Sequence, residues 1–335
     1  MLIEVTVIGN RIDRVTVSGD RPPIVSHLRG QPSHVVQRTL PLMYAVCARA
    51  HAAAVAAALK SARDGSVTTT ADSEVAAEAA REQLLAILTG PAKFHLPQAV
   101  RSIGTPGALR ELFSEWLLGM AVEDWLALDS MEDVMLWTST SSSVLAAEFQ
   151  RRLDLGEPSS HRIAVLPVVD AAESLRRWST PTEALRVDVA QTGAISRELH
   201  HPLIRELQAR PLLQRWLARV RDVARYASGD PQSVVGRVSA VATEPGRGRS
   251  IVETARGMLM HEVGLDGDVV TDYAIVTPTQ QNLHPDGAVR RWLEGTRVAS
   301  EVEALDLARR AIEALDPCLE WQCAVVRGGS RSASA

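Results

Sequence analysis

The chain of 335 residues is 46% hydrophobic and 23% charged, with a formal net charge of −4 at pH 7. Its basic residues are spread among acidic ones, which argues against nucleic-acid binding. No apolar run approaches the roughly 18 residues of a membrane helix, and no signal peptide is expected. Three cysteines are too few for a disulfide framework in so long a chain, so we expect free thiols in the reducing cytoplasm.

The N-terminal third begins with a predicted β-hairpin over residues 2–17. Branched apolar residues alternate there with polar ones, and Gly9-Asn10 supplies a turn. Residues 20–37 contain Pro22, Pro23, Gly30 and Pro32 and predict a loop. The polar residues 61–73 predict an exposed connection.

Residues 40–59 predict a helix that carries Cys47 and, four residues later, His51. On a helix this spacing places both side chains on one face. Taken alone, the pair is more typical of a small buried cysteine and a hydrogen-bonded histidine than of a metal site.

Helices and strands alternate irregularly along the rest of the chain. Further helices are predicted over residues 74–88, 106–128, 144–153, 202–227 and 299–315. The tryptophans and Met120 in the second of these are typical of a core. Strands are predicted over residues 163–169, 250–262 and 269–276, the last two around the turn Leu265-Asp266-Gly267-Asp268, with a loop over 277–282.

The last helix is expected to bury Val302, Leu305, Ala308, Ile312 and Leu315. Because proline disfavours helical geometry in the preceding residue, this helix should end at Asp316, before Pro317. Cys318 then lies on a bend, with Cys323 shortly beyond. The fold class is α+β: a bundle of long helices packed beside N-terminal and C-terminal β-hairpins. We expect one domain over residues 1–326 and a disordered tail over 327–335.

Several segments, in chain order, resemble the large subunit of nickel-iron hydrogenases. The N-terminal hairpin is similar to that subunit's first strands. Cys47-Ala-Arg-Ala-His51 resembles the second half of its first metal motif, Arg-x-Cys-Gly-x-Cys-x-x-x-His. Asp316-Pro-Cys318 resembles the start of its last motif, Asp-Pro-Cys-x-x-Cys-x-x-His.

Three intermediate segments carry the same resemblance. Gly246-x-Gly248 followed by Glu253-Thr-Ala-Arg256-Gly is similar to the family's Gly-x-Gly…Glu-Ala-Pro-Arg-Gly. Val276-Thr-Pro-Thr-Gln-Gln-Asn282 is similar to its Val-Pro-Thr-Thr-Trp-Asn, and the segment ending at Arg197 more weakly to its Gly-x-Leu-Ala-Arg. The order of these matches along the chain gives the resemblance its weight.

The departures from the family pattern concern the metal ligands. In these hydrogenases four thiolates bind nickel, and two of them bridge to an iron that carries two cyanides and one carbon monoxide. Here Tyr44 stands at the first cysteine of the N-terminal motif, Trp321 at the second cysteine of the C-terminal motif and Ala324 at its histidine. Three cysteines cannot build a four-thiolate nickel site, so no nickel is expected. Two soft thiolates could still hold the iron fragment, as Fe(CN)2(CO), transiently.

The resemblance implies a site with assigned roles. Cys47 matches a bridging position, and its partner is either Cys318 or Cys323. Arg256 would face the cyanides. The alternative is an internal ion pair with Glu253, but residues three apart on a strand point to opposite faces, which argues against that pair. The metal candidates are therefore Cys47, Cys318 and Cys323, and the cofactor-binding candidates are Arg256, Pro278, Thr279, His51 and Glu253.

The chain with these departures resembles the HupK/HoxV-type hydrogenase expression/formation proteins. That resemblance implies a non-enzymatic scaffold that receives the Fe(CN)2(CO) unit and passes it to the hydrogenase large subunit precursor, with maturation chaperones as further partners. The alternative is a metal-free mimic of the large subunit that docks those chaperones or the small subunit. A working hydrogenase ranks third, because two of the four ligand positions are lost.

Overall fold

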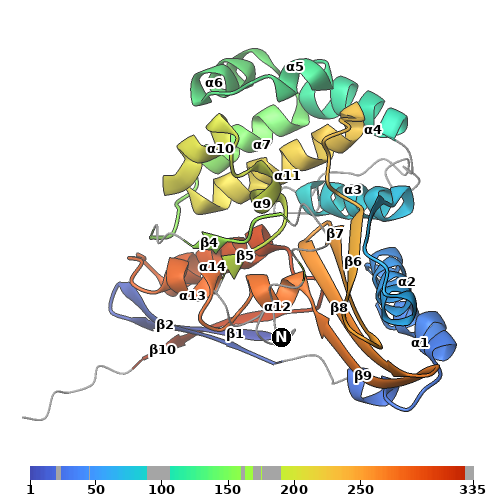
Figure 1. Cartoon of the computed structure of the whole chain (residues 1–335). Helices are drawn as coiled ribbons and strands as arrows, with labels where there is room; N and C mark the ends of the chain where they lie inside the picture. Colours follow the sequence, from blue (N-terminus) through green and yellow to red (C-terminus); the bar gives the residue numbers. More distant parts are fainter. Residues whose placement is uncertain are drawn as a thin grey trace, which may run out of the picture.

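A computed structural model describes residues 1–19, 24–44, 46–88, 106–159, 163–168, 175 and 190–328. Figure 1 shows a group of helices above two β-sheets, one of which is larger and carries helix α2 (Ala48–Asp64) on its outer side. The α+β class is confirmed. The two expected hairpins, however, are parts of larger sheets.

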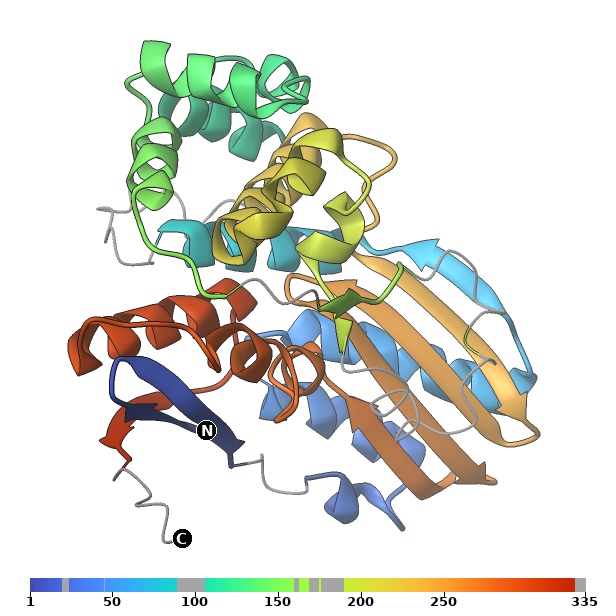
Figure 2. The same ribbon diagram turned by 90° about the vertical axis from the view of Figure 1, so that its left-hand side faces the viewer.

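The N-terminal hairpin consists of β1 (Leu2–Ile8) and β2 (Arg11–Ser18), joined at Gly9 and Asn10. Strand β10 (Gln322–Arg327) pairs in parallel with β1 and completes a sheet of order β10-β1-β2. The C-terminal segment thus returns to the N-terminus, as Figure 2 also shows. No strand was predicted here. Of the expected tail, Arg327 ends β10, and residues 329–335 lie outside the described residues.

The larger sheet is antiparallel and has the order β3-β6-β7-β8-β9. Its strands are β3 (Thr68–Ala71), β6 (Arg237–Glu244), β7 (Arg247–Thr254), β8 (Gly257–Asp266) and β9 (Val269–Val276). The strand predicted over 250–262 is wrong, because the chain turns back at Ala255 and Arg256. Gly257, at a φ of 122°, permits that turn. The exposed connection predicted over 61–73 instead contains the end of α2 and the edge strand β3.

Helix α2 packs directly on the middle of this sheet through small residues, among them Ala54 and Ala58. Gly248 on β7 makes the close approach possible. A Cβ atom at this position would lie 2.0 Å from the carbonyl oxygen of Ala58 and 2.6 Å from the amide nitrogen of Ala62. The Gly-x-Gly segment therefore has a packing role beneath the helix that begins at the first cysteine.

Replacing Gly248 by alanine is expected to lower the free energy of unfolding by about 3 kcal/mol, because the new methyl group overlaps helix backbone that cannot move independently. Urea denaturation followed by circular dichroism measures the change. Gly156 is exposed, and a Cβ there meets nothing within 4 Å, so Gly156→Ala is the matched control and should stay within about 0.5 kcal/mol. Equal effects of the two substitutions would contradict the packing role.

The helical part surrounds α11 (Pro211–Ser228), whose inner face is buried. Its other members are α3 (Ser73–Leu88), α4 (Pro106–Leu112) with a π-helical turn (Phe113–Leu118), α5 (Val122–Leu126), α6 (Met131–Thr140), α7 (Val144–Leu153), α9 (Ala194–Glu198) and α10 (Pro202–Glu206). The expected helices 106–128 and 202–227 are each interrupted, the first at the left-handed Gly119 and the second before Pro211. The predicted tryptophan core is confirmed at Trp125, which is 1% exposed.

The C-terminal third adds α12 (Pro278–Asn282), α13 (Ala288–Leu293) and α14 (Glu301–Leu315). The loop predicted over 277–282 is wrong: Thr277 and Gln280 form a capping box that starts α12. On α14 Val302 is 77% exposed, contrary to prediction, whereas Ala308, Ile312 and Leu315 are buried as expected.

Smaller elements complete the described chain: 3₁₀ turns at Ile24–Leu28, Leu40–Met43 and Leu207–Ala209, helix α1 (Ser33–Thr39), and a two-residue parallel pair, β4 (Ala164–Val165) with β5 (Ala190–Gln191). Helix α1 falls in the predicted loop 20–37, of which residues 20–23 lie outside the described residues. Only the two residues of β4 realise the strand predicted over 163–169, whose last residue is likewise not described.

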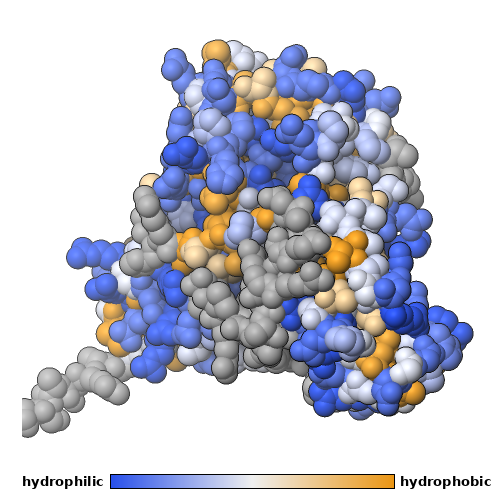
Figure 3. Space-filling model, in the orientation of Figure 1, coloured by the Kyte–Doolittle hydropathy of each residue, from blue (hydrophilic) through white to orange (hydrophobic). Residues whose placement is uncertain are grey.

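The surface visible in Figure 3 is mainly hydrophilic over its described parts, with hydrophobic residues in small separate areas. None of the described helices combines the length and the apolar character that crossing a membrane would require.

Candidate functional site

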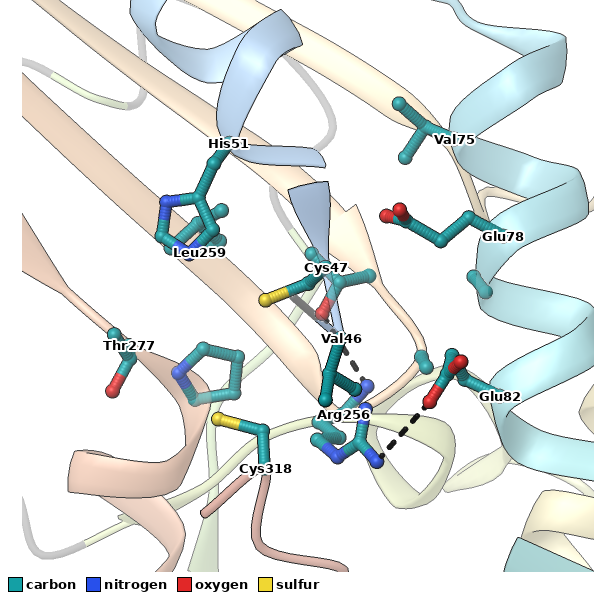
Figure 4. A pocket seen from close by; sticks show the side chains of 14 residues that line it. Val46, Cys47, His51, Val75, Glu78, Glu82, Arg256, Leu259, Thr277 and Cys318 are labelled. Atoms are coloured by element: carbon teal, nitrogen blue, oxygen red, sulfur yellow. Dashed lines mark hydrogen bonds and ion pairs between the residues drawn. The ribbon is translucent and has the colours of Figure 1, made fainter. Parts of the chain in front are cut away.

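A pocket forms where the start of α2, the turn between β7 and β8, the start of α12 and the end of α14 converge (Figure 4). Its empty volume is about 430 Å³. Both Cys47 and Cys318 line it, although 271 positions of sequence separate them. The other lining residues are Val46, His51, Val75, Glu78, Ala79, Glu82, Thr254, Ala255, Arg256, Leu259, Thr277 and Pro278.

Cys47 occupies the N-cap position of α2, with φ −135° and ψ 42°, so the helix starts later than predicted. Its side chain makes no capping hydrogen bond. Glu78, which reaches across from α3, instead accepts hydrogen bonds from the amides of Arg49 (2.9 Å) and Ala50 (3.1 Å). Because a carboxylate from another helix satisfies these amides, the Cys47 thiol is left for other partners.

Cys318 follows the end of α14, which stops at Asp316 as predicted. Asp316 has a φ of 48°, in the left-handed region, and the following Pro317 disfavours continuation of the right-handed helix at this residue. The amide of Cys318 donates to the Thr279 hydroxyl oxygen at 3.2 Å, and the same oxygen lies 3.1 Å from the Cys318 sulfur. Since that oxygen already accepts from the amide, its own proton can be donated to the sulfur.

The two thiols are close enough to hydrogen-bond to each other. This hydrogen bond with Cys318 and burial raise the pKa of Cys47 well above its ordinary range, whereas the nearby Arg256 acts in the opposite direction. The thiol of Cys47 is therefore protonated at neutral pH in the free protein. No group of three or more histidine, cysteine or acidic side chains that could hold a metal ion occurs in the part of the chain that the structure describes. The site thus offers two thiols.

Two of the predicted site residues lie elsewhere. Cys323 is in β10, where it is half-buried against the core under the three-stranded sheet, and it does not line the pocket. Glu253 is buried and pairs with Arg197, its carboxylate oxygen 2.9 Å from the guanidinium. The geometry therefore selects Cys318 as the neighbour of Cys47 and gives Glu253 a structural role in place of the predicted cofactor-binding one.

Arg256 lies in the turn between β7 and β8, not on a strand, so the strand argument about Glu253 does not apply. Its Nε donates to the carbonyl oxygen of Asp316 at 2.9 Å, and its Nη2 lies 3.6 Å from a carboxylate oxygen of Glu82. Nη1 has no partner among the described residues. The guanidinium is thus held in place on two sides and keeps donors for a ligand in the pocket.

His51 is completely buried and is one of the residues that line the pocket. Its Nδ1 lies 2.9 Å from Nε2 of His261, whose own Nδ1 lies 2.8 Å from the Tyr273 hydroxyl. Burial lowers the pKa of His261 to about 3, so this ring is neutral. Tyr44 stacks on the His51 ring at 3.6 Å between centroids. A tyrosine at the position of the absent cysteine thus fixes the orientation of the histidine.

Sequence reasoning missed four residues of this site: Glu78, Glu82, His261 and Tyr273. The four-residue spacing of the two glutamates on a predicted helix was a visible signal. The histidine and tyrosine gave none, because their pairing depends on the register between β8 and β9.

The chain is similar to several known proteins. The family model described as "Nickel-dependent hydrogenase" matches residues 177–326. A protein named hydrogenase expression/formation protein HupK, from Azotobacter vinelandii, is 28% identical, with 91% of this chain and 92% of that protein covered. The corresponding protein named HoxV, from Cupriavidus necator, is 26% identical, with 91% of each covered. The resemblance of the chain to HupK/HoxV-type proteins is therefore confirmed.

Solved structures support the fold. The reduced Ni-Fe-Se hydrogenase from Desulfovibrio vulgaris Hildenborough superposes with a TM-score of 0.56 at 14% identity, covering 94% of this chain and 95% of that chain. The reduced, active form of the enzyme from Desulfomicrobium baculatum gives the same TM-score at 13% identity, with the same coverage. The chain thus has the fold of a hydrogenase large subunit.

Proposed function

We propose that this protein acts in nickel-iron hydrogenase maturation as a non-enzymatic scaffold that holds the Fe(CN)2(CO) unit on Cys47 and Cys318 and passes it to the hydrogenase large subunit precursor. The observation that carries the proposal is the convergence of these two distant thiols in one pocket, beside a fixed guanidinium. In this role the iron unit is cargo, and the cytoplasm is where it would be loaded and delivered.

The donor set suits such cargo. Thiolates are soft ligands that bind low-spin iron, and both thiols lose their protons when a metal binds. Tyr44, at the position of a third cysteine in the hydrogenase pattern, is a buried core residue, and Trp321, at that of a fourth, packs beside the three-stranded sheet. Two thiolates hold a metal less firmly than four, which favours delivery over permanent retention.

Arg256 would stabilise the cargo directly, and Thr279 would do so through the sulfur of Cys318. Cyanide nitrogens are anionic acceptors, and the free Nη1 of Arg256 is a charge-assisted donor at the same pocket. The Thr279 hydroxyl lies against the Cys318 sulfur and can donate to it when it is a thiolate. Pro278 also lines the pocket, and as a proline it has no backbone N–H to donate.

An exit for the cargo lies beside the pocket. A wider groove, with an empty volume of about 1480 Å³, shares Val46, Glu82, Arg256 and Cys318 with it. Since Cys318 borders both spaces, a thiolate of an incoming large subunit precursor could reach iron bound there. Maturation chaperones are the further partners that this role requires.

Infrared spectroscopy of the protein purified with its maturation machinery tests the proposal. The wild-type protein should show two cyanide bands and one carbonyl band, and Cys47→Ser or Cys318→Ser should lose them because a ligand is gone. Cys323→Ser is the matched control and should keep them, since Cys323 lies outside the pocket. Wild-type protein without these bands, or a Cys323→Ser variant that alone loses them, would refute the proposed iron site.

A further inference from the structure

A second pocket shares Ala255 and Arg256 with the thiol pocket but contains neither cysteine. Its empty volume is about 350 Å³, and it lies between α11, the end of α14 and the segment from Gln191 to Ile195. Its walls belong to elements far apart in the sequence. None of the roles described above uses this pocket.

The charge of its walls is positive. Arg215, Arg219 and Arg256 line the pocket, together with Asp316. Asp316 is paired with Arg256, one oxygen lying 3.3 Å from Nε. Neither Arg215 nor Arg219 forms an ion pair with a carboxylate in the described ranges. Two cationic groups at the pocket therefore lack an anionic partner.

Arg215 is held in place by neutral groups. Its Nε and Nη2 donate to Oε1 of Gln191 at 2.9 and 2.6 Å, and its guanidinium lies over the ring of Trp292 at 4.9 Å. These contacts satisfy most of its donors but leave its charge unneutralised. Arg215 thus contributes mainly an electrostatic field.

Arg219 differs because most of its donors are unused. The side chain is only 9% exposed, and its one hydrogen bond within the described residues goes from Nη2 to the carbonyl oxygen of Ala314, at 3.0 Å. Burial lowers the pKa of Arg219. Gln191, which is 1% exposed, also has a side-chain nitrogen without a partner among these residues. A buried donor without an acceptor is costly, so the side-chain nitrogen of Gln191 indicates an absent acceptor.

We infer that this pocket binds a small oxyanion, of the carboxylate or phosphate class, with Arg219 and Gln191 as hydrogen-bond donors and Arg215 as a second positive charge. An oxyanion presents several acceptor oxygens at once, which matches the planar fork of an arginine. The volume of the pocket limits the ligand to a small molecule or ion. The inference does not depend on the proposed iron cargo.

Calorimetric titration of the full chain with sodium phosphate and, separately, sodium acetate tests the site, with sodium chloride at equal ionic strength as reference. We expect saturable binding of at least one oxyanion, and comparison of the two shows which class is preferred. Arg219→Met should weaken it by roughly tenfold or more, because a charge-assisted hydrogen bond is lost. Arg309→Met is the matched control: Arg309 is exposed on α14, and its removal should leave the affinity unchanged.

Wild-type protein that binds neither oxyanion beyond the chloride reference would overturn the inference. So would an equal loss of affinity in Arg219→Met and Arg309→Met, which would indicate surface ion binding. If Arg219→Met does not fold, Arg219→Lys replaces it, since lysine keeps the charge but loses the fork. A measurable loss of affinity is then expected, and unchanged affinity would count against the site.

Discussion

Hydrogenase activity in a strain that lacks this protein is expected to be restored by the wild-type gene and not by Cys318→Ser. The serine hydroxyl is a hard, weakly acidic donor and cannot replace a thiolate on low-spin iron. Even loss of an outer partner of a metal ligand costs about 10–100-fold in affinity, so loss of one of two ligands should reduce transferred iron by roughly 100-fold or more. Hydrogen uptake by whole cells measures the result.

Cys47→Ser should give the same loss, because the two thiols meet in one pocket. Cys323→Ser serves as control, since it removes a half-buried thiol of the same C-terminal segment without touching the pocket. Full activity with Cys318→Ser would contradict the scaffold and favour the metal-free mimic, which needs the surface of the large subunit but not its thiols. Immunoblots of the variants separate loss of function from loss of protein.

Replacing Arg197 by methionine is expected to lower the free energy of unfolding by about 3–5 kcal/mol, because it leaves two buried carboxylates without their counter-ion. Arg197 is about 3% exposed in its side chain and lies 2.7 Å from an oxygen of Asp222 and 2.9 Å from one of Glu253. Urea denaturation at neutral pH gives the value.

Arg290→Met is the control for charge removal in general. Arg290 is exposed and pairs with Asp286 and Glu294 one turn away on either side, so its loss should cost less than about 1 kcal/mol. Arg197, Asp222 and Glu253 are also connected to the site. The side-chain nitrogen of Gln83 donates to Asp222 at 2.6 Å and to the carbonyl oxygen of Ala255, next to Arg256, at 2.9 Å. A cost under 1 kcal/mol for Arg197→Met would contradict its role as the counter-ion of the two buried carboxylates.

The sequence predicted local features where local rules decide them. The hairpin over residues 2–17, the helix over 144–153 and the end of α14 at Asp316 follow from alternation, periodicity and proline sterics. The predicted elements were wrong where tertiary packing, and not the local residue pattern, decides the backbone conformation. Residues 250–262 were predicted as one strand, although the chain turns back at Ala255 and Arg256. Both strands beside the turn are buried, so no exposed polar stretch separates them in the sequence.

The identities of the residues are enough to show that the chain keeps two cysteines of a hydrogenase-like pattern and has Tyr44 and Trp321 in place of two others. They leave open whether Cys318 or Cys323 faces Cys47, and the folded chain makes that choice. Strand β10 pairs with β1 and carries Cys323 away, whereas the bend at Asp316 and Pro317 turns Cys318 toward the start of α2. Contacts between segments so distant in sequence are set by packing of the whole fold, which no local pattern of residues records.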